Sequence, residues 1–225
     1  MKTTVFNLII LDESGSMGNV TKQTISGCNE TINVAKSSAE KNADAIRSLT
    51  SIYAFQSGGP VKSRYILKNE DSTKVRHITD KDYQPWGATP LLDAVGSTLT
   101  ELKTVAATHE DATGVITIIT DGMENSSERY TWKDVASLIE QFKEMGWTVN
   151  LIGANIDVND MADMMNIDNR MAFEASESGT HAMFNKFVSR SKVCLDGYAE
   201  EARCCPNVGQ RVSNRKKRSS DFFER

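Results

Sequence analysis

The chain has 225 residues, of which 39% are hydrophobic and 25% charged, values typical of a soluble globular protein with room for one α/β domain. It does not open with a basic stretch, an apolar core and a small-residue cleavage site, and its first apolar run, Val5 to Leu11, is too short to span a membrane. We therefore expect an intracellular, cytoplasmic protein. The cysteines and histidines lack zinc-ligand spacing, and a disulfide between the adjacent Cys204 and Cys205 would be strained, so we expect reduced thiols.

Strand and helix signals alternate along the chain. Buried strands are indicated by continuous β-branched and apolar runs, and helices by apolar residues at helical spacing. In chain order we expect a strand at 4–11, a long helix at 20–49, a strand at 50–57, an edge strand or hairpin within 61–79, a helix from Leu91, a strand at 113–120, a helix at 132–146, a strand at 148–155, a short helix near 158–165, a weak strand at 171–175 and a last helix at about 180–203. This order predicts a doubly wound, Rossmann-like α/β fold with a mainly parallel central sheet, one antiparallel edge strand and helices on both faces.

Charge is distributed unevenly over the chain. The formal net charge is −4, but the six basic and two acidic residues from Pro206 onward give that segment +4, so the preceding 205 residues carry −8. We expect one domain at 1–205 followed by a basic, disordered tail at 206–225. The acidic domain is a poor binder of polyanions, so any contact with nucleic acid would go through the tail.

Short oxygen-bearing side chains follow the predicted strands at the sheet edge where α/β folds place their sites. They are Asp12, Ser14 and Ser16 after the first strand, Thr89 before the second helix, and Asp121 after the strand at 113–120. Oxygen donors alone, without His or Cys, favour a hard divalent cation such as Mg²⁺ or Mn²⁺. The alternatives are helix capping and turn formation by the same residues. We expect the nearby acids Glu13, Asp93 and Glu124 to be solvated or capping groups.

Taken together, Asp12-x-Ser14-x-Ser16, Thr89 in Gly-Ala-Thr-Pro and Asp121 in Thr-Asp-Gly resemble the metal-ion-dependent adhesion site of von Willebrand factor A domains, with all five positions present. The phrase "GATPLLDAVG" is most similar to small stand-alone bacterial and phage members. The resemblance implies that the three hydroxyls bind Mg²⁺ or Mn²⁺ (Ca²⁺ being a further option) directly and the two carboxylates partly through water. It also implies that a carboxylate of a partner protein completes the coordination, without a membrane or nucleic acid.

The main alternative is an enzyme, a metal-dependent phosphotransferase or hydrolase with Asp12 as nucleophile. Aspartyl phosphotransferases need a second aspartate two residues further on as general acid, and here that position is Ser14. The sequence also lacks the glycine-rich patterns that bind nucleoside triphosphates and dinucleotides. We therefore expect a binding module and not an enzyme.

Overall fold

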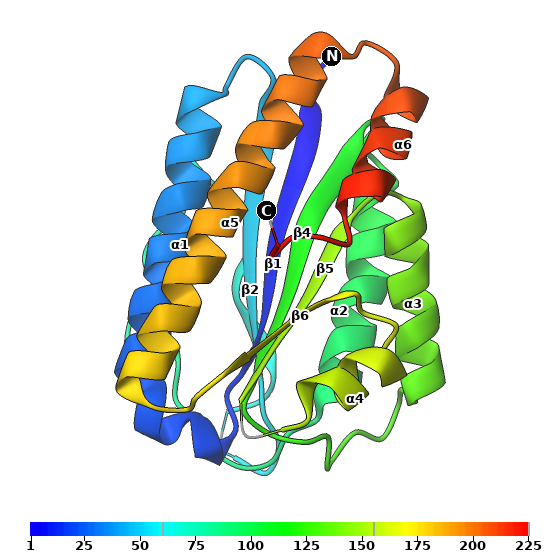
Figure 1. The fold of residues 1–225 in the computed structure, drawn as a ribbon. Coiled ribbons are helices and arrows are strands. Elements are labelled where there is room, and N and C mark those ends of the chain that lie inside the picture. Colours follow the sequence, from blue (N-terminus) through cyan, green and yellow to red (C-terminus); the bar gives the residue numbers. More distant parts are fainter. Residues whose placement is uncertain (60, 155, 225) are drawn as a thin grey trace.

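Six strands form a single sheet in the order β3-β2-β1-β4-β5-β6, in a computed structural model that describes residues 1–59, 61–154 and 156–224 (Figure 1). Strands β1, β2, β4, β5 and β6 are parallel, and β3 pairs antiparallel with β2 at one edge. The strands are β1 (Thr3–Asp12), β2 (Ile46–Phe55), β3 (Arg64–Asp71), β4 (Ala112–Thr120), β5 (Thr148–Ala154) and β6 (Asn169–Phe173). The predicted doubly wound α/β fold with one antiparallel edge strand is confirmed.

Helices cover both faces of the sheet, with α1 and α5 side by side on one face and α2, α3 and α4 on the other (Figure 1). The helices are the 3₁₀ helix η1 (Gly15–Val20), α1 (Thr21–Lys41), α2 (Leu91–Ala106), α3 (Trp132–Glu144), α4 (Val158–Met164), α5 (Glu177–Cys204) and α6 (Val208–Arg218). No helix in the described part of the chain is long and apolar enough to cross a membrane.

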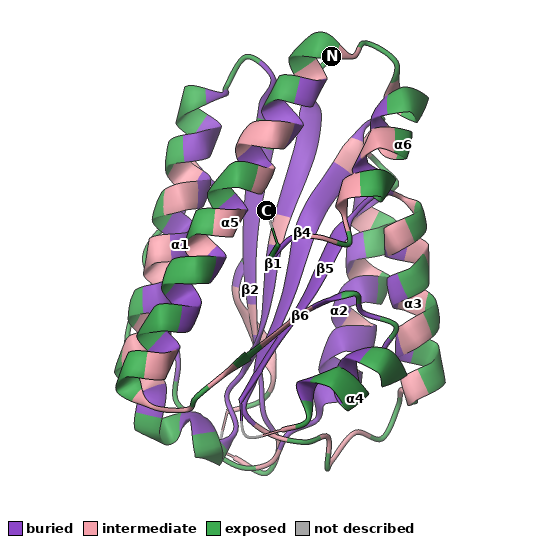
Figure 2. Ribbon diagram, in the orientation of Figure 1, coloured by how far each residue is buried: buried purple, intermediate pink, exposed green. Residues whose placement is uncertain are grey.

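The sheet is buried on both sides, and Figure 2 shows most of its strand residues in the buried class. Alternate residues of β1 enter different cores: Ile9 and Leu11 pack with α1 and α5, whereas Leu8 and Ile10 pack with α2 and α3. Because successive strand side chains point to opposite faces, a strand with two covered faces must be apolar at nearly every position. This explains the continuous apolar run that precedes Asp12.

Two predicted element boundaries are wrong. The helix expected to reach residue 49 ends at Lys41, and β2 begins at Ile46, opposite Thr3 of β1. Asn42 ends the helix: its side-chain amide donates to the Ser38 carbonyl and to the Asp196 carboxylate on α5. No strand forms at residues 74–79, and Asn155, the expected last residue of the fifth strand, lies outside the described residues.

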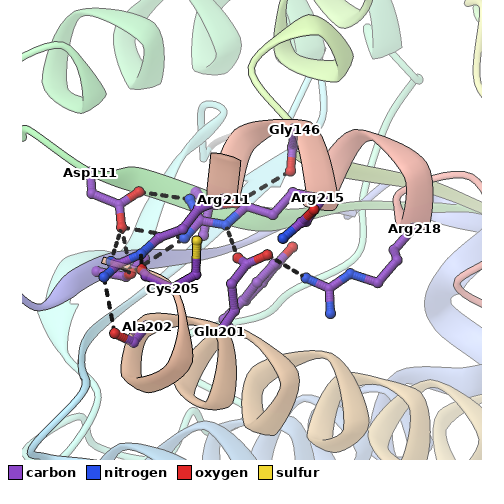
Figure 3. Close-up of polar contacts among 12 residues, drawn as sticks. Asp111, Gly146, Glu201, Ala202, Cys205, Arg211, Arg215 and Arg218 are labelled. Carbon is purple, nitrogen blue, oxygen red and sulfur yellow. Dashed lines mark hydrogen bonds and ion pairs between the residues drawn. The ribbon is translucent and has the colours of Figure 1, made fainter. Parts of the chain in front are cut away.

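The prediction of a disordered tail is also wrong, because residues 208–218 form α6 at the amino ends of β1 and β4. Arg211 and Arg215, one helical turn apart, are both buried and converge on Asp111, each with an N–O distance of 2.7 Å (Figure 3). Arg215 also contacts Glu201 of α5 at 2.6 Å. Internal ion pairs therefore hold this basic segment, which was expected to be a disordered tail, against the domain.

Candidate metal site

The five predicted site residues lie at the carboxyl end of the sheet, where β1 and β4 are neighbours. Asp12 is the last residue of β1, and Asp121 directly follows β4. Ser14 directly precedes η1, Ser16 is the second residue of η1, and Thr89 precedes α2. Parallel neighbouring strands bring the two carboxylates to one edge although 109 positions separate them in sequence (121 − 12).

Asp12 is fully buried and held by hydrogen bonds to both carboxylate oxygens. The backbone N–H of Ser14 donates to Oδ1 at 2.7 Å, and the Thr120 hydroxyl donates to Oδ2 at 2.5 Å. The Tyr83 hydroxyl donates to the Asp12 carbonyl oxygen at 2.6 Å. The Asp12 carboxylate is therefore oriented by the loop after β1 and by the last residue of β4, and Tyr83 holds the Asp12 backbone.

Ser14, Ser16 and Asp121 continue from Asp12 as a chain of hydrogen bonds, and Thr89 lies close to Asp12. The Ser14 and Ser16 hydroxyl oxygens are 3.1 Å apart, and the Ser16 hydroxyl donates to Asp121 Oδ1 at 2.6 Å. A Cβ built on Gly122 would lie 3.2 Å from Thr89 Oγ1 and 3.9 Å from Asp12 Oδ2. The absence of a side chain at this glycine thus leaves space beside both oxygens.

The cluster carries negative charge that no ion pair with a described side chain neutralises. Burial raises the pKa of Asp12 to about 6, although the hydrogen bonds from Thr120 and Ser14 oppose this and the charge of Asp121 adds to it. Burial also raises the pKa of Asp121. Among the described residues no Lys, Arg or His forms an ion pair with either carboxylate. The negative charge is left for a cation from solution.

The donor set fits a hard divalent cation. No three His, Cys, Asp or Glu side chains group together as a metal site within the described ranges, so two carboxylates must be supplemented by neutral oxygens. Ser14, Ser16 and Thr89 provide hydroxyl oxygens of the kind that Mg²⁺ and Mn²⁺ accept. Ser16 is exposed, which places one side of the cluster at the surface.

Glu13 differs from the expectation that it is solvated or capping. It is fully buried and accepts two hydrogen bonds from the Arg64 guanidinium of β3, at 2.6 and 3.1 Å. It also accepts from the Gln56 amide at 3.1 Å and from the Gln84 backbone. Glu13 therefore attaches the first loop to the edge strand β3, a structural role that differs from the metal-binding role predicted for Asp12 and Asp121.

Glu124 is a capping group, as expected, whereas Asp93 binds the backbone of the third loop instead of being solvated or capping a helix. The Glu124 carboxylate accepts from the Leu92 backbone in the first turn of α2 and from two backbone N–H groups of its own loop. Asp93 accepts from three consecutive backbone N–H groups at 128–130. These bonds join the second and third loops to each other.

Sequence reasoning missed Asn125, which positions Thr89. The Asn125 side-chain oxygen accepts from the Thr89 backbone N–H at 2.8 Å, and the Thr89 carbonyl accepts from the Asn125 backbone at 3.2 Å. The only signal in the sequence was a short polar residue four positions after Asp121, too common to single out. These two hydrogen bonds hold the loop that carries Thr89 against the loop that carries Asp121.

The fold is that of von Willebrand factor A domains, as comparison with solved structures shows. No family model matches the chain, and no curated protein sequence matches it. A von Willebrand factor type A protein from Catenulispora acidiphila is similar at a TM-score of 0.53 and 17% identity, covering 85% of this chain and 43% of that one. Manganese-loaded TRAP protein of Plasmodium vivax is similar at a TM-score of 0.53 and 16% identity, covering 83% and 73%.

A third similar structure is proximal thread matrix protein 1 from the mussel byssus with a zinc-occupied MIDAS motif, with a TM-score of 0.55 and 12% identity, covering 86% of this chain and 46% of that one. The chain thus spans less than half the length of the Catenulispora and mussel proteins. At such identities the comparisons establish the fold, and the chemistry of the site rests on the residues described above.

Proposed function

We propose that this chain is a protein-binding module that holds Mg²⁺ or Mn²⁺ in the cluster of Asp12, Ser14, Ser16, Thr89 and Asp121 and captures a carboxylate of a partner protein. The observation that carries the proposal is the convergence of two carboxylates and three hydroxyls, with no ion pair to a cationic side chain among the described residues. The manganese-loaded TRAP protein and the byssus protein with a zinc-occupied MIDAS motif support a divalent cation in general. A cytoplasmic location is part of the same proposal.

The five residues and their neighbours divide the work of holding the cation. The two carboxylates balance the charge of the cation, and the three hydroxyls add neutral oxygens. Thr120 and the Ser14 backbone orient Asp12, while Asn125 orients Thr89. When bound, the cation supplies an electrophilic position for an incoming anion, because neutral hydroxyls quench little of its charge.

The enzyme alternative gains no support from the geometry. Asp12 is fully buried, and both of its oxygens already accept hydrogen bonds, so an attack on a phosphoryl group would have to break these contacts. Ser14, at the position where a phosphotransferase needs a general acid, cannot serve as one. Contact with nucleic acid is also disfavoured, because Arg211 and Arg215 of α6 are buried and paired with Asp111.

Partner capture tests the proposal. The immobilised chain is incubated with cell lysate in Mg²⁺ or in EDTA, and Asp12→Asn is compared with Glu40→Ala, which removes an exposed carboxylate at the far end of α1. We expect capture by the wild type and Glu40→Ala in Mg²⁺, and none in EDTA or by Asp12→Asn. Amidation of lysate carboxyl groups with carbodiimide and glycinamide should abolish capture. Capture that survives EDTA and Asp12→Asn would refute the metal mechanism.

A further inference from the structure

A second recess lies between α5 and the C-terminal segment, at the opposite end of the sheet from the proposed metal site. Its volume is about 380 Å³, within the range of small-molecule sites, and its floor includes Thr148 at the start of β5. Tyr198 of α5 closes the floor, with its hydroxyl 3.3 Å from the Thr148 hydroxyl. Nothing in the proposed metal mechanism uses this recess.

Arginine side chains form the polar wall of the recess. Arg215 is buried and engaged by Asp111 and Glu201, whereas Arg218 binds Glu201 through Nη2 alone at 2.8 Å (Figure 3). Arg190 is half-buried in the wall and forms no ion pair with any residue that the structure describes. Positive charge is therefore available at this wall.

The acids that line the recess do not cancel that charge. The Asp196 carboxylate is directed to α1, where it accepts from Lys41 at 3.1 Å and from Asn42 at 2.9 Å. Glu200 is exposed and screened by water. The recess is thus suited to an anion.

The remaining wall is apolar. Phe222 is 6% exposed and is held in place by rings of Phe187 and Phe223 and by a backbone hydrogen bond to the Asn169 side chain at 2.8 Å. Val193, on the α5 side, is 54% exposed, although large hydrophobic side chains of the described residues are mostly buried. An apolar group bound beside Phe222 would remove the exposed surface of Val193 from water.

Gly197, in the C-terminal third of α5, keeps the recess open. It lines this recess and a neighbouring one of about 430 Å³, and a Cβ built on it would come no closer than 3.9 Å to Arg218 Nη1. A glycine inside a helix is unfavourable relative to other residues, and the space beside this one would accept a side chain. The sequence therefore leaves unfilled a space that a larger residue would occupy.

We propose that this recess binds a short aliphatic carboxylic acid in its ionised form. The carboxylate pairs with the guanidinium groups of Arg190 and Arg218, which favour planar anions, and the aliphatic chain lies between Val193 and Phe222. This ligand matches both walls, whereas a bare inorganic anion would leave the apolar wall exposed and an alcohol would leave the arginines unpaired.

Calorimetric titration with three probes tests the ligand class. Octanoate, octylammonium and acetate are titrated into the full chain, and octanoate should bind at a single site. Octylammonium carries the same chain with the opposite charge, and acetate carries the charge without the chain, so both should bind at least about tenfold more weakly. Equal affinity for octanoate and octylammonium, or no binding of octanoate, would overturn the proposal.

Variants then locate the site. Gly197→Leu should abolish octanoate binding by filling the recess, and its better helix propensity should preserve folding, which circular dichroism checks. Arg190→Gln should weaken binding by about tenfold through loss of a charge-assisted hydrogen bond, and it decides the question if the leucine variant does not fold. Lys192→Gln, which removes an exposed cation on α5, and Asp12→Asn should bind as the wild type. Wild-type binding by folded Gly197→Leu or by Arg190→Gln would contradict the assignment.

Discussion

The two ends of the sheet bury an aspartate in opposite ways. Asp12 at the carboxyl end and Asp111 at the amino end are 0% and 3% exposed. Asp111 meets two arginines and the Thr3 hydroxyl, which donates at 2.6 Å, whereas Asp12 accepts from the Ser14 backbone and the Thr120 hydroxyl and forms no ion pair with a described residue.

The difference shows in their pKa values. Burial alone would raise the pKa of Asp111, but hydrogen bonds and charge from Arg215, with Thr3 and Arg211, outweigh it and hold that pKa below its usual value. For Asp12, burial prevails and raises the pKa to about 6. One carboxylate is neutralised inside the chain and serves stability, while the other keeps a charge that an external cation can neutralise.

Deleting residues 206–225 should have the largest effect on the amino end. The truncation removes both arginines and exposes the surface that Phe222 and Phe223 cover. Loss of the two buried rings alone should lower the free energy of unfolding by about 3–6 kcal/mol. Urea denaturation followed by circular dichroism measures it, and an unchanged stability would mean that α6 does not pack on the domain.

The next largest effect is expected from Asp111→Asn. Removing the carboxylate leaves Arg211 and Arg215 buried with reduced compensation, and breaking such a buried pair costs about 3–5 kcal/mol. The same change at Asp12 in metal-free buffer should cost far less, because no cation loses its partner there. Equal losses in the two urea midpoints would contradict the contrast between the two ends.

Acid should destabilise the amino end progressively. Since the pKa of folded Asp111 is lowered, its contribution to stability is fully present above the unfolded value of about 3.9 and is lost as pH falls through the folded value. The unfolding free energy of the wild type should therefore decrease more steeply below about pH 4 than that of Asp111→Asn. Parallel pH profiles for the two proteins would show that the arginines do not lower the pKa of Asp111 in the folded protein.

The smallest effect is expected from Lys216→Ala, on the solvent side of α6. It forms an ion pair with Glu144 of α3, in which the lysine side chain is 40% exposed and the glutamate side chain 64%. Because both are in contact with water, the substitution should change stability by less than about 1 kcal/mol. A loss as large as that of Asp111→Asn would mean that the surface charges of α6, and not the buried ones, attach it to the domain.

The sequence predicts the carboxyl end better than the amino end. Apolar runs reveal strands with two covered faces, Asp12 and Asp121 stand at the ends of strands whose order implies a common edge, and Thr89 precedes the second helix. The roles of Glu13 and α6 depend instead on distant partners. Arg64 is 51 positions from Glu13, and Arg211 is 100 positions from Asp111. A basic segment is indistinguishable from a solvated tail until such a partner is located in the fold.

Titration with Mn²⁺ tests directly whether the cluster at the carboxyl end of the sheet binds a divalent cation. Electron paramagnetic resonance counts free Mn²⁺ in solutions of wild type, Asp12→Asn and Asp111→Asn, at a temperature where all three are folded. We predict one bound Mn²⁺ per chain for the wild type and for Asp111→Asn, and none for Asp12→Asn. Binding of Mn²⁺ by Asp12→Asn as tightly as by the wild type would show that the cluster around Asp12 is not the metal site.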